Sequence, residues 1–557
     1  MQRLTRILAV CCLSVATFVS AHAGNADPLS LLPADAHVII RVQAPEKTLQ
    51  DLADFVNSIQ PGAGGMILGQ QATIGAGIGN PGLVGVDMSR DWYVAINVNK
   101  GGPPQTALLL PTTDADAMQN AMGGLTGHAI GDWVAFARNE GDLAGIKSCE
   151  QGDAKSVALA DDVKAAFSSR HAAVLINGTQ VKEQFADELK QMEAQWEGFV
   201  SMIVAQVQAT SPQTNMESVE ELYSMMGKTA IQIINDTESL LLTVNVANGN
   251  LEFGEMLSVS SDSASGRYLS GQQSSTFAQL AKMPAGLQGY LGVNVDVRPM
   301  MDWSLNMMVG ALSEDPEVAA KLKTQFESVR DWKVGEMCLG GGFSQAGGMQ
   351  YLQRTELAPG KVVREFMKAF GELGKVTVSG IEQEYDYQPA AEKVAGLEVD
   401  VLNVRQTIPE GFDPTGMTKE LIDAMYGANG MQQRVAVDGD VIYQVVGGDL
   451  KLLGAMVTGD AQPTTAWTSA RAAHPEQLNV MGMIDLPATV LSAMKMFSKV
   501  PQAGIPVDPQ MLDSIQFPES YVGFSMVAKK DRLDVLTTIP ATTLQNFFMV
   551  VTRVQQF

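Results

Sequence analysis

Hydrophobic and polar positions follow two periods along this chain of 557 residues. Short apolar runs such as Val38–Val42 are typical of strands, whereas residues 48–59 repeat apolar side chains at helical spacing. Residues 92–110 predict a β-hairpin around the turn Lys100-Gly101-Gly102-Pro103. A further helix is expected over residues 114–122. The pattern therefore predicts a unit made of a strand, a helix and a hairpin.

The same order of elements returns three times. The expected strand, helix and hairpin lie at 172–176, 181–208 and 240–259, then at 287–297, 300–312 and 334–354, and finally at 478–484, 488–498 and 521–538. An extra hairpin and helix follow the first and third units, at about 128–146 and 434–457. Hairpins give antiparallel sheets, and the helices between them cover a face. We expect an α+β fold of tandem duplicated strand–helix–β-hairpin units.

Short sequence matches indicate that the chain is duplicated. Arg90-Asp91-Trp92 recurs as Arg330-Asp331-Trp332, and Gly131-Asp132 is echoed by Gly439-Asp440. Because these matches keep their order, they predict two homologous halves, at 24–282 and 283–557. The second half is expected to carry an insertion near residues 383–418.

The first 23 residues have the pattern of a secretory signal peptide. Arg3 and Arg6 precede an uncharged apolar run over residues 7–19, and Ala21-His22-Ala23 supplies small residues for cleavage after Ala23. The sequence thus predicts a periplasmic or secreted protein. No transmembrane segment is expected in the mature chain, because no apolar stretch there reaches spanning length.

The charge of the chain argues against nucleic acid as a partner. The net charge is −23, and it becomes −25 (−23 − 2) when Arg3 and Arg6 leave with the signal peptide. Such a surface repels phosphate backbones and anionic lipid headgroups. Hydrophobic residues make up 46% and charged residues 18% of the chain, which is typical of globular proteins.

Two cysteines, Cys149 and Cys338, remain after the signal peptide. In an oxidising compartment they could form a disulfide, and the alternative is two free, buried thiols. The chain has no C-x-x-C motif and no cluster of cysteine and histidine. We therefore expect neither a metal site nor a cofactor.

Several motifs resemble functional sites but lack the required context. Gly77–Gly82 matches G-x-G-x-x-G, yet a helix precedes it and extended chain follows, so we expect a loop and no dinucleotide site. The histidines are scattered. The segment Asp438–Asp449 lacks the ligand series of a calcium loop, which favours a hairpin turn. Met481–Met483 has the spacing of some copper sites, although methionine as core filler is the more common role.

One apolar stripe in the predicted helix over residues 181–208 is a candidate ligand or partner surface. It is formed by Phe185, Leu189, Met192, Trp196, Phe199, Ile203 and Val207. Spacings of three and four place these residues on one helix face. The face could pack on the helix's own sheet, cover a partner, or close over a lipid cavity.

Two segments carry a resemblance to a known family. Leu32-Pro33-Ala34-Asp35-Ala36, followed by a strand and a helix, and Gly131-Asp132-Trp133-Val134 in a hairpin resemble an uncharacterised family of exported bacterial repeat proteins. Large examples of this family occur in planctomycete-type bacteria. The resemblance implies an α+β repeat fold and an envelope location, and it implies no catalytic residues.

The leading hypothesis is an exported, non-catalytic envelope scaffold or binding protein, because no nucleophile–base or metal constellation is recognisable. Its partner would be an envelope protein or a hydrophobic ligand. The alternative is a periplasmic carrier of lipid or another hydrophobic ligand. A second alternative is an unrecognised hydrolase, which would need carboxylates such as Asp91, Asp132, Asp331 and Asp440 to converge in a cleft.

Overall fold

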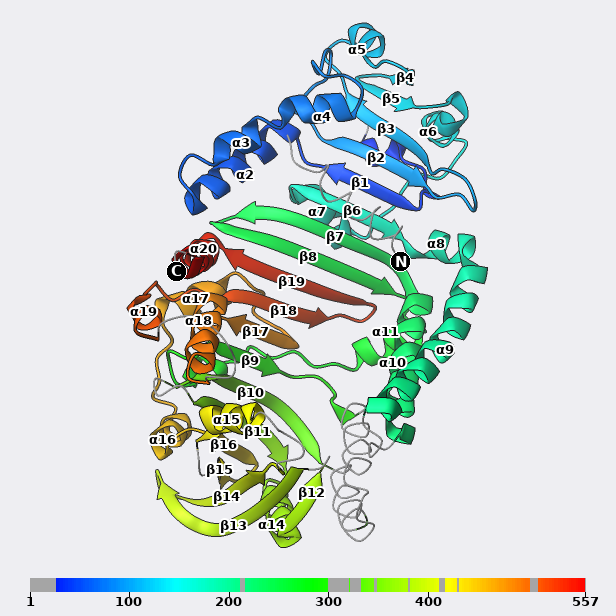
Figure 1. The fold of residues 1–557 in the computed structure, drawn as a ribbon. Coiled ribbons are helices and arrows are strands. Elements are labelled where there is room, and N and C mark those ends of the chain that lie inside the picture. The colour runs from blue at the N-terminus through cyan, green and yellow to red at the C-terminus, as the bar shows by residue number, and fades with distance from the viewer. Residues whose placement is uncertain are drawn as a thin grey trace. The chain divides into compact units, whose positions relative to one another are not determined.

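The computed structural model describes residues 27–210, 216–298, 320, 332–344, 348–378, 381–409, 416–427, 430–500 and 509–555. The predicted signal peptide and the helix expected over 300–312 lie outside the described residues. The chain forms two compact units (Figure 1). The first unit comprises Met1–Gln191, Gln232–Arg267 and Lys530–Ala541, and the second comprises Met192–Ile231, Tyr268–Lys529 and Thr542–Phe557.

The first unit is built on an antiparallel sheet. Its strands pair in the order β4-β5-β3-β2-β1-β6-β7-β8-β19. The strands are β1 (Val38–Val42), β2 (Trp92–Asn97), β3 (Gln105–Pro111), β4 (Thr126–Ile130), β5 (Trp133–Ala137), β6 (Ala172–Asn177), β7 (Thr237–Ala247), β8 (Asn250–Val259) and β19 (Arg532–Pro540). They are rich in β-branched and aliphatic residues, as expected for strands. Strand β19, from near the end of the chain, pairs with β8.

Helices of the first unit lie on both faces of this sheet. They are η1 (Pro28–Leu31), α2 (Pro45–Ile59), α3 (Gly64–Leu68), α4 (Gln71–Gly77), α5 (Ala115–Ala121), η2 (Glu140–Leu143), α6 (Ala144–Gln151), α7 (Asp161–Ser169) and α8 (Gly178–Gln184). Helices α9 (Ala186–Thr210), α10 (Met216–Asp236) and α11 (Ala264–Ser270) cross the boundary between the units.

The core of the first unit has one cluster on each face of the sheet. On one face, Ile39 and Leu241 belong to a cluster that includes Phe167 of α7. On the other face, Trp92 and Phe136 pack with helical residues such as Met118 of α5. The first cluster extends across the sheet from β4 to β7, whereas the strand residues of the second come from β1, β2, β3 and β5 alone. The second face of β6, β7, β8 and β19 therefore has no residue in this cluster.

The second unit is also built on an antiparallel sheet. Its strands pair in the order β12-β13-β14-β15-β16-β11-β10-β9-β17-β18. The strands are β9 (Gly289–Val293), β10 (Lys333–Phe343), β11 (Met349–Ala358), β12 (Lys375–Val378), β13 (Ile381–Val394), β14 (Leu397–Thr407), β15 (Met431–Asp438), β16 (Val441–Val446), β17 (Val480–Ile484) and β18 (Val522–Ala528).

The helices of the second unit pack on both faces of its sheet. They are η3 (Leu280–Lys282), α14 (Val362–Leu373), α15 (Met417–Tyr426), α16 (Leu450–Thr458), α17 (Thr465–Ala472), α18 (Leu486–Phe497), α19 (Pro509–Ser514) and α20 (Ala541–Gln555). Tyr290, Cys338 and Leu352 of the strands form a cluster with Trp467 of α17 and Leu453 of α16.

The two sheets share an order of pairing. The order β4-β5-β3-β2-β1-β6-β7 in the first unit corresponds to β15-β16-β11-β10-β9-β17-β18 in the second. Strands β12, β13 and β14 have no counterpart in the first unit's described strands, and β13 and β14 fall largely in the expected insertion at 383–418. The boundary between halves at 282/283 stays a prediction, because the compact units interleave along the sequence.

The α+β class expected from the sequence is confirmed, and the expected strands are present with small shifts of their ends. Two expectations need correction. The helix over 181–208 is two helices, α8 and α9, because the backbone of Phe185, which follows the last residue of α8, leaves the helical conformation at φ −113° and ψ 26°. The motif Gly77–Gly82 is turn from Ile78 onward, as expected, but the two short helices that precede it, α3 and α4, are not predicted by the sequence pattern.

Candidate hydrophobic ligand site

One face of the first unit's sheet carries aliphatic side chains that belong to none of the core clusters formed by the described residues. The pairing register places them together, for example Ile176 opposite Leu240, Val174 opposite Leu242, and Leu257 opposite Leu533. We call this surface the open face. It is formed by Val38, Val94, Ile96, Val174, Ile176, Leu240, Leu242, Val244, Val246, Leu251, Phe253, Leu257, Leu533, Val535 and Ile539.

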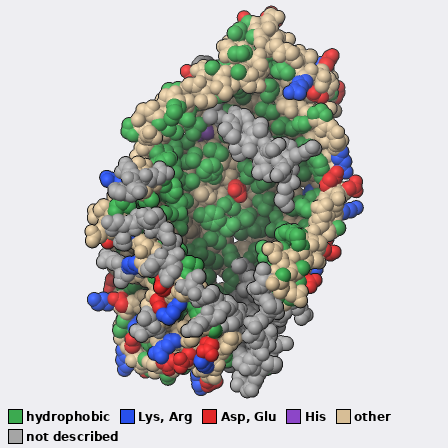
Figure 2. Space-filling model, in the orientation of Figure 1, with side chains coloured by type: hydrophobic (Ala, Val, Ile, Leu, Met, Phe, Trp, Pro, Cys, Tyr) green, Lys and Arg blue, Asp and Glu red, His purple; other side chains and the backbone are tan. Residues whose placement is uncertain are grey.

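The side chains on the two faces of the sheet differ in their exposure to solvent. Every side chain named for the open face is partly exposed, and Phe253 reaches 39%, whereas Ile40, between Val94 and Val174 on the same face, is buried. On β6 and β7, their neighbours on the opposite face, such as Ala173 at 0% and Leu241 at 1%, are buried. Figure 2 shows hydrophobic side chains gathered over β7 and β8 on the face turned to the viewer.

The chemistry of the open face is apolar over most of its extent. Glu255, between Leu242 and Val535 in the register, and Thr537, beside Phe253, are polar side chains within it. The main-chain amides and carbonyls are used in pairing between the strands, so the face offers few hydrogen-bonding groups. A surface of this kind favours a ligand that is itself apolar, because contact removes hydrocarbon from water on both sides.

The apolar stripe predicted on residues 181–208 lies elsewhere, on α9 and the α8–α9 junction. None of its seven residues is buried, and Met192 (38%) and Phe199 (42%) are exposed. Trp196 packs toward α10, where its indole Nε1 donates to the carbonyl of Tyr223 at 2.9 Å. Gly227 makes room for this indole, because a Cβ there would meet Trp196 at 1.9 Å. The stripe therefore serves partly as a contact between α9 and α10.

The two cysteines are free, buried thiols in this structure, which is the alternative to a disulfide. Cys149 lies on α6 in the first unit and Cys338 on β10 in the second. Burial raises the pKa of both thiols, and the nearby Glu336 carboxylate raises the pKa of Cys338 further. Neither residue has the exposed, electropositive surroundings of a reactive thiol.

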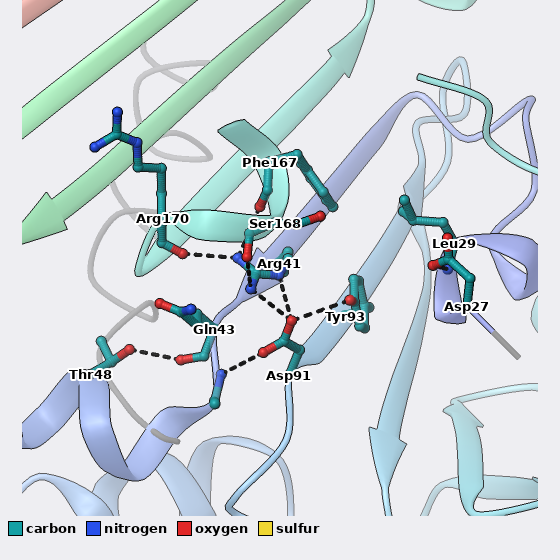
Figure 3. A network of polar contacts seen from close by, with 11 residues as sticks. Asp27, Leu29, Arg41, Gln43, Thr48, Asp91, Tyr93, Phe167, Ser168 and Arg170 are labelled. Carbon is teal, nitrogen blue, oxygen red and sulfur yellow. Dashed lines mark hydrogen bonds and ion pairs between the residues drawn. The ribbon is translucent and has the colours of Figure 1, made fainter. Parts of the chain in front are cut away.

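Asp91 belongs to a structural network around a buried arginine (Figure 3). Arg41 is 1% exposed, and its Nε and Nη2 each lie 2.7 Å from Oδ2 of Asp91. Its guanidinium also donates to three main-chain carbonyls at the end of α7, at 2.6–2.9 Å. These carbonyls belong to Phe167, Ser168 and Arg170. Arg41 thus ties β1 to the end of α7, and Asp91 balances its charge.

The other carboxylates considered for a hydrolase also have structural partners. Asp132 forms an ion pair with Arg90, and Oδ1 of Asp440 accepts from the amide of Gly360 at 3.0 Å. Asp331 lies outside the described residues. Asp132 is in the first unit and Asp440 in the second. The described carboxylates therefore stabilise turns and loops of their own units.

A histidine and a serine in the second unit are hydrogen-bonded as in a catalytic dyad, but both are buried. Nδ1 of His474 lies 2.8 Å from Oγ of Ser525, and both residues are buried. Burial, aided by the charge of Arg471, lowers the pKa of His474 to about 4. No sequence motif links these two residues, because 50 residues of chain lie between them. Since Ser525 is only 2% exposed, substrate has no access to it.

One cleft in the second unit has a mixed lining. It measures about 640 Å³ between α14 and β13, and both signs of charge line it, from Arg364 and Lys368 to Glu372 and Asp386. Among the described residues, no group of three or more potential ligands could hold a metal ion. Within that same part of the chain, no helix combines the length and the apolar composition needed to cross a membrane.

Comparisons with known proteins leave the family open. No family model matches the chain, and no curated protein matches its sequence. One solved structure, titled "Structure of crystal form III of TP0453", aligns with 48% of this chain and 96% of its own, at 9% identity and a TM-score of 0.23. A likeness at that level carries no argument about fold or function.

Proposed function

We propose that this protein is an exported, non-catalytic binding protein of the bacterial envelope that holds the acyl chain of a lipid, or a similar hydrophobic ligand, on the open face. The observation that carries the proposal is the set of partly exposed aliphatic side chains on β6, β7, β8 and β19. Contiguous apolar surface that stays exposed on a folded domain marks binding sites more often than surface without a role. Membership in the exported repeat family, export itself and an envelope location are parts of the same proposal.

A scaffold that binds only protein partners is the competing function. Cores of protein interfaces are enriched in tyrosine, tryptophan and arginine. The open face instead consists of valine, leucine and isoleucine, with Phe253 as its aromatic residue. The aliphatic composition therefore favours an acyl chain over a protein surface.

The test is a titration of the chain from Gly24 onward with a fluorescent fatty-acid probe. The double variant Leu242→Ser/Val535→Ser places two hydroxyls in one row of the open face, because both residues flank Glu255 in the register. Each lost apolar contact costs about 1.5 kcal/mol, so binding should weaken at least tenfold. The control is Leu486→Ser, a leucine that is 40% exposed on α18.

Unchanged binding in the double variant, or an equal loss in the control, would overturn the proposal. Circular dichroism must show both variants folded. Solvent extraction of protein purified without detergent, followed by mass spectrometry, identifies the ligand class. A stoichiometric lipid supports the proposal, and a protein that binds neither lipid nor probe contradicts it.

A further inference from the structure

The first unit also exposes apolar side chains on α3 and in the turn after α4. Met66 and Leu68 of α3 are 68% and 42% exposed, and Val84 is 49% exposed. Residues 55–86, which contain them, include no Asp, Glu, Lys, Arg or His. In a chain with net charge −23, this is a long uncharged stretch that presents hydrocarbon to solvent. We call residues 62–86 the tip.

The tip is held in place by hydrogen bonds and close packing. The amide of Gly64 donates to Oδ1 of Asn57 on α2 at 2.8 Å, and a Cβ on Gly64 would lie 2.4 Å from the carbonyl of Ala53. Asn80 is buried, and its amide group bonds both the N–H and the carbonyl of Val84 at 3.0 and 2.9 Å. The exposed side chains are therefore carried on a built support, and Figure 1 shows α2 and α3 extending away from the strands.

We propose that the tip inserts Met66 and Leu68 into the interface of a zwitterionic lipid bilayer. The charge pattern selects this occupant. An uncharged tip gains nothing from anionic headgroups, and the acidic remainder of the chain is repelled by them. A zwitterionic surface accepts exposed hydrocarbon at no electrostatic cost.

A protein partner fits the tip less well. Residues 55–86 contain no Trp, Tyr or Arg, which are the usual anchors of protein interfaces, and their single aromatic residue, Phe55, is buried. This proposal does not depend on the open face, because the open face is formed by strands and the tip by α3, α4 and the turns around them.

The experiment is flotation of the chain from Gly24 onward with phosphatidylcholine vesicles, against vesicles that also contain phosphatidylglycerol. The wild-type chain should float with phosphatidylcholine and less with the anionic mixture. Met66→Asp/Leu68→Asp should lower the fraction bound by about tenfold or more, since each side chain loses its hydrocarbon contact. Met417→Asp, at a methionine that is 45% exposed on α15, is the matched control and should bind as the wild type does.

Failure of the wild-type chain to float, or equal binding by the tip variant, would overturn the proposal. Stronger binding to the anionic vesicles would also overturn it, because the charge argument predicts the reverse. The fatty-acid probe separates the two proposals. The tip variant should keep full probe binding, whereas Leu242→Ser/Val535→Ser should lose probe binding and still float.

Discussion

Replacement of Arg41 by methionine tests whether the buried guanidinium holds the first unit together. Methionine keeps much of the side-chain volume, so the change removes polar contacts and creates little cavity. Three carbonyls at the end of α7 lose their donor, and Asp91 loses its ion pair. Removing one partner of a buried ion pair costs about 3–5 kcal/mol.

The lower end of that range applies here, because the Asp91 side chain is 27% exposed and water can replace part of its contact with Arg41. A loss of about 3 kcal/mol lowers the melting temperature of a unit of this size by about 6–12 °C. Differential scanning calorimetry measures the shift, and hydrogen exchange of the β1 and α7 amides assigns it to the first unit.

The matched control is Arg298→Met. Arg298 pairs with Asp296, but its side chain is 70% exposed, so the melting temperature should stay near that of the wild type. A shift below about 2 °C for Arg41→Met would refute the reasoning, because it would mean that water or a rearranged α7 satisfies the freed carbonyls.

Three further outcomes are expected. Because the folded pKa of His474 is about 4 and the unfolded value is near 6.5, the second unit should lose stability as pH falls from 6.5 to 4, and His474→Gln should flatten that slope in thermal unfolding. Cys149 and Cys338 should react slowly with iodoacetamide in the native protein and give two labelled thiols after unfolding without reductant, whereas no labelling would indicate a disulfide. Gly85→Ala should lower the free energy of unfolding by about 2 kcal/mol or more, since φ is +71° and a Cβ would lie 2.4 Å from a main-chain oxygen. Gly62→Ala, also at positive φ but in open space, should lower it less, and urea unfolding measures both.

Strands were the best-predicted elements of this fold. Val38–Val42 is predicted and observed with the same bounds, because a short apolar run ending before a proline leaves little choice of structure. The long helix was misread at Phe185, where apolar periodicity continues although the backbone does not. Periodicity reports which residues share a face, and a change of helix that preserves the face leaves no signal in it.

The open face could not be predicted from the sequence. Leu240, Leu241 and Leu242 form a continuous apolar run, which is typical of a strand buried on both faces. Only the packing of other elements distinguishes Leu241, at 1% exposure, from its partly exposed neighbours. The same holds for Met66, since an apolar residue in a glycine-rich segment reads equally well as core or as surface.

The pairing of β19 with β8 has a consequence for how the chain is made. Residues 260–531 separate the two strands, so a ribosome delivers β8 long before its partner exists. Until the last part of the chain emerges, β8 is an unpaired edge with free amides and carbonyls, a template for pairing with other chains. Contacts so distant in sequence also form slowly. Premature termination anywhere before Lys530 would therefore leave the first unit with an open edge, and nascent chains need protection from aggregation until synthesis is complete.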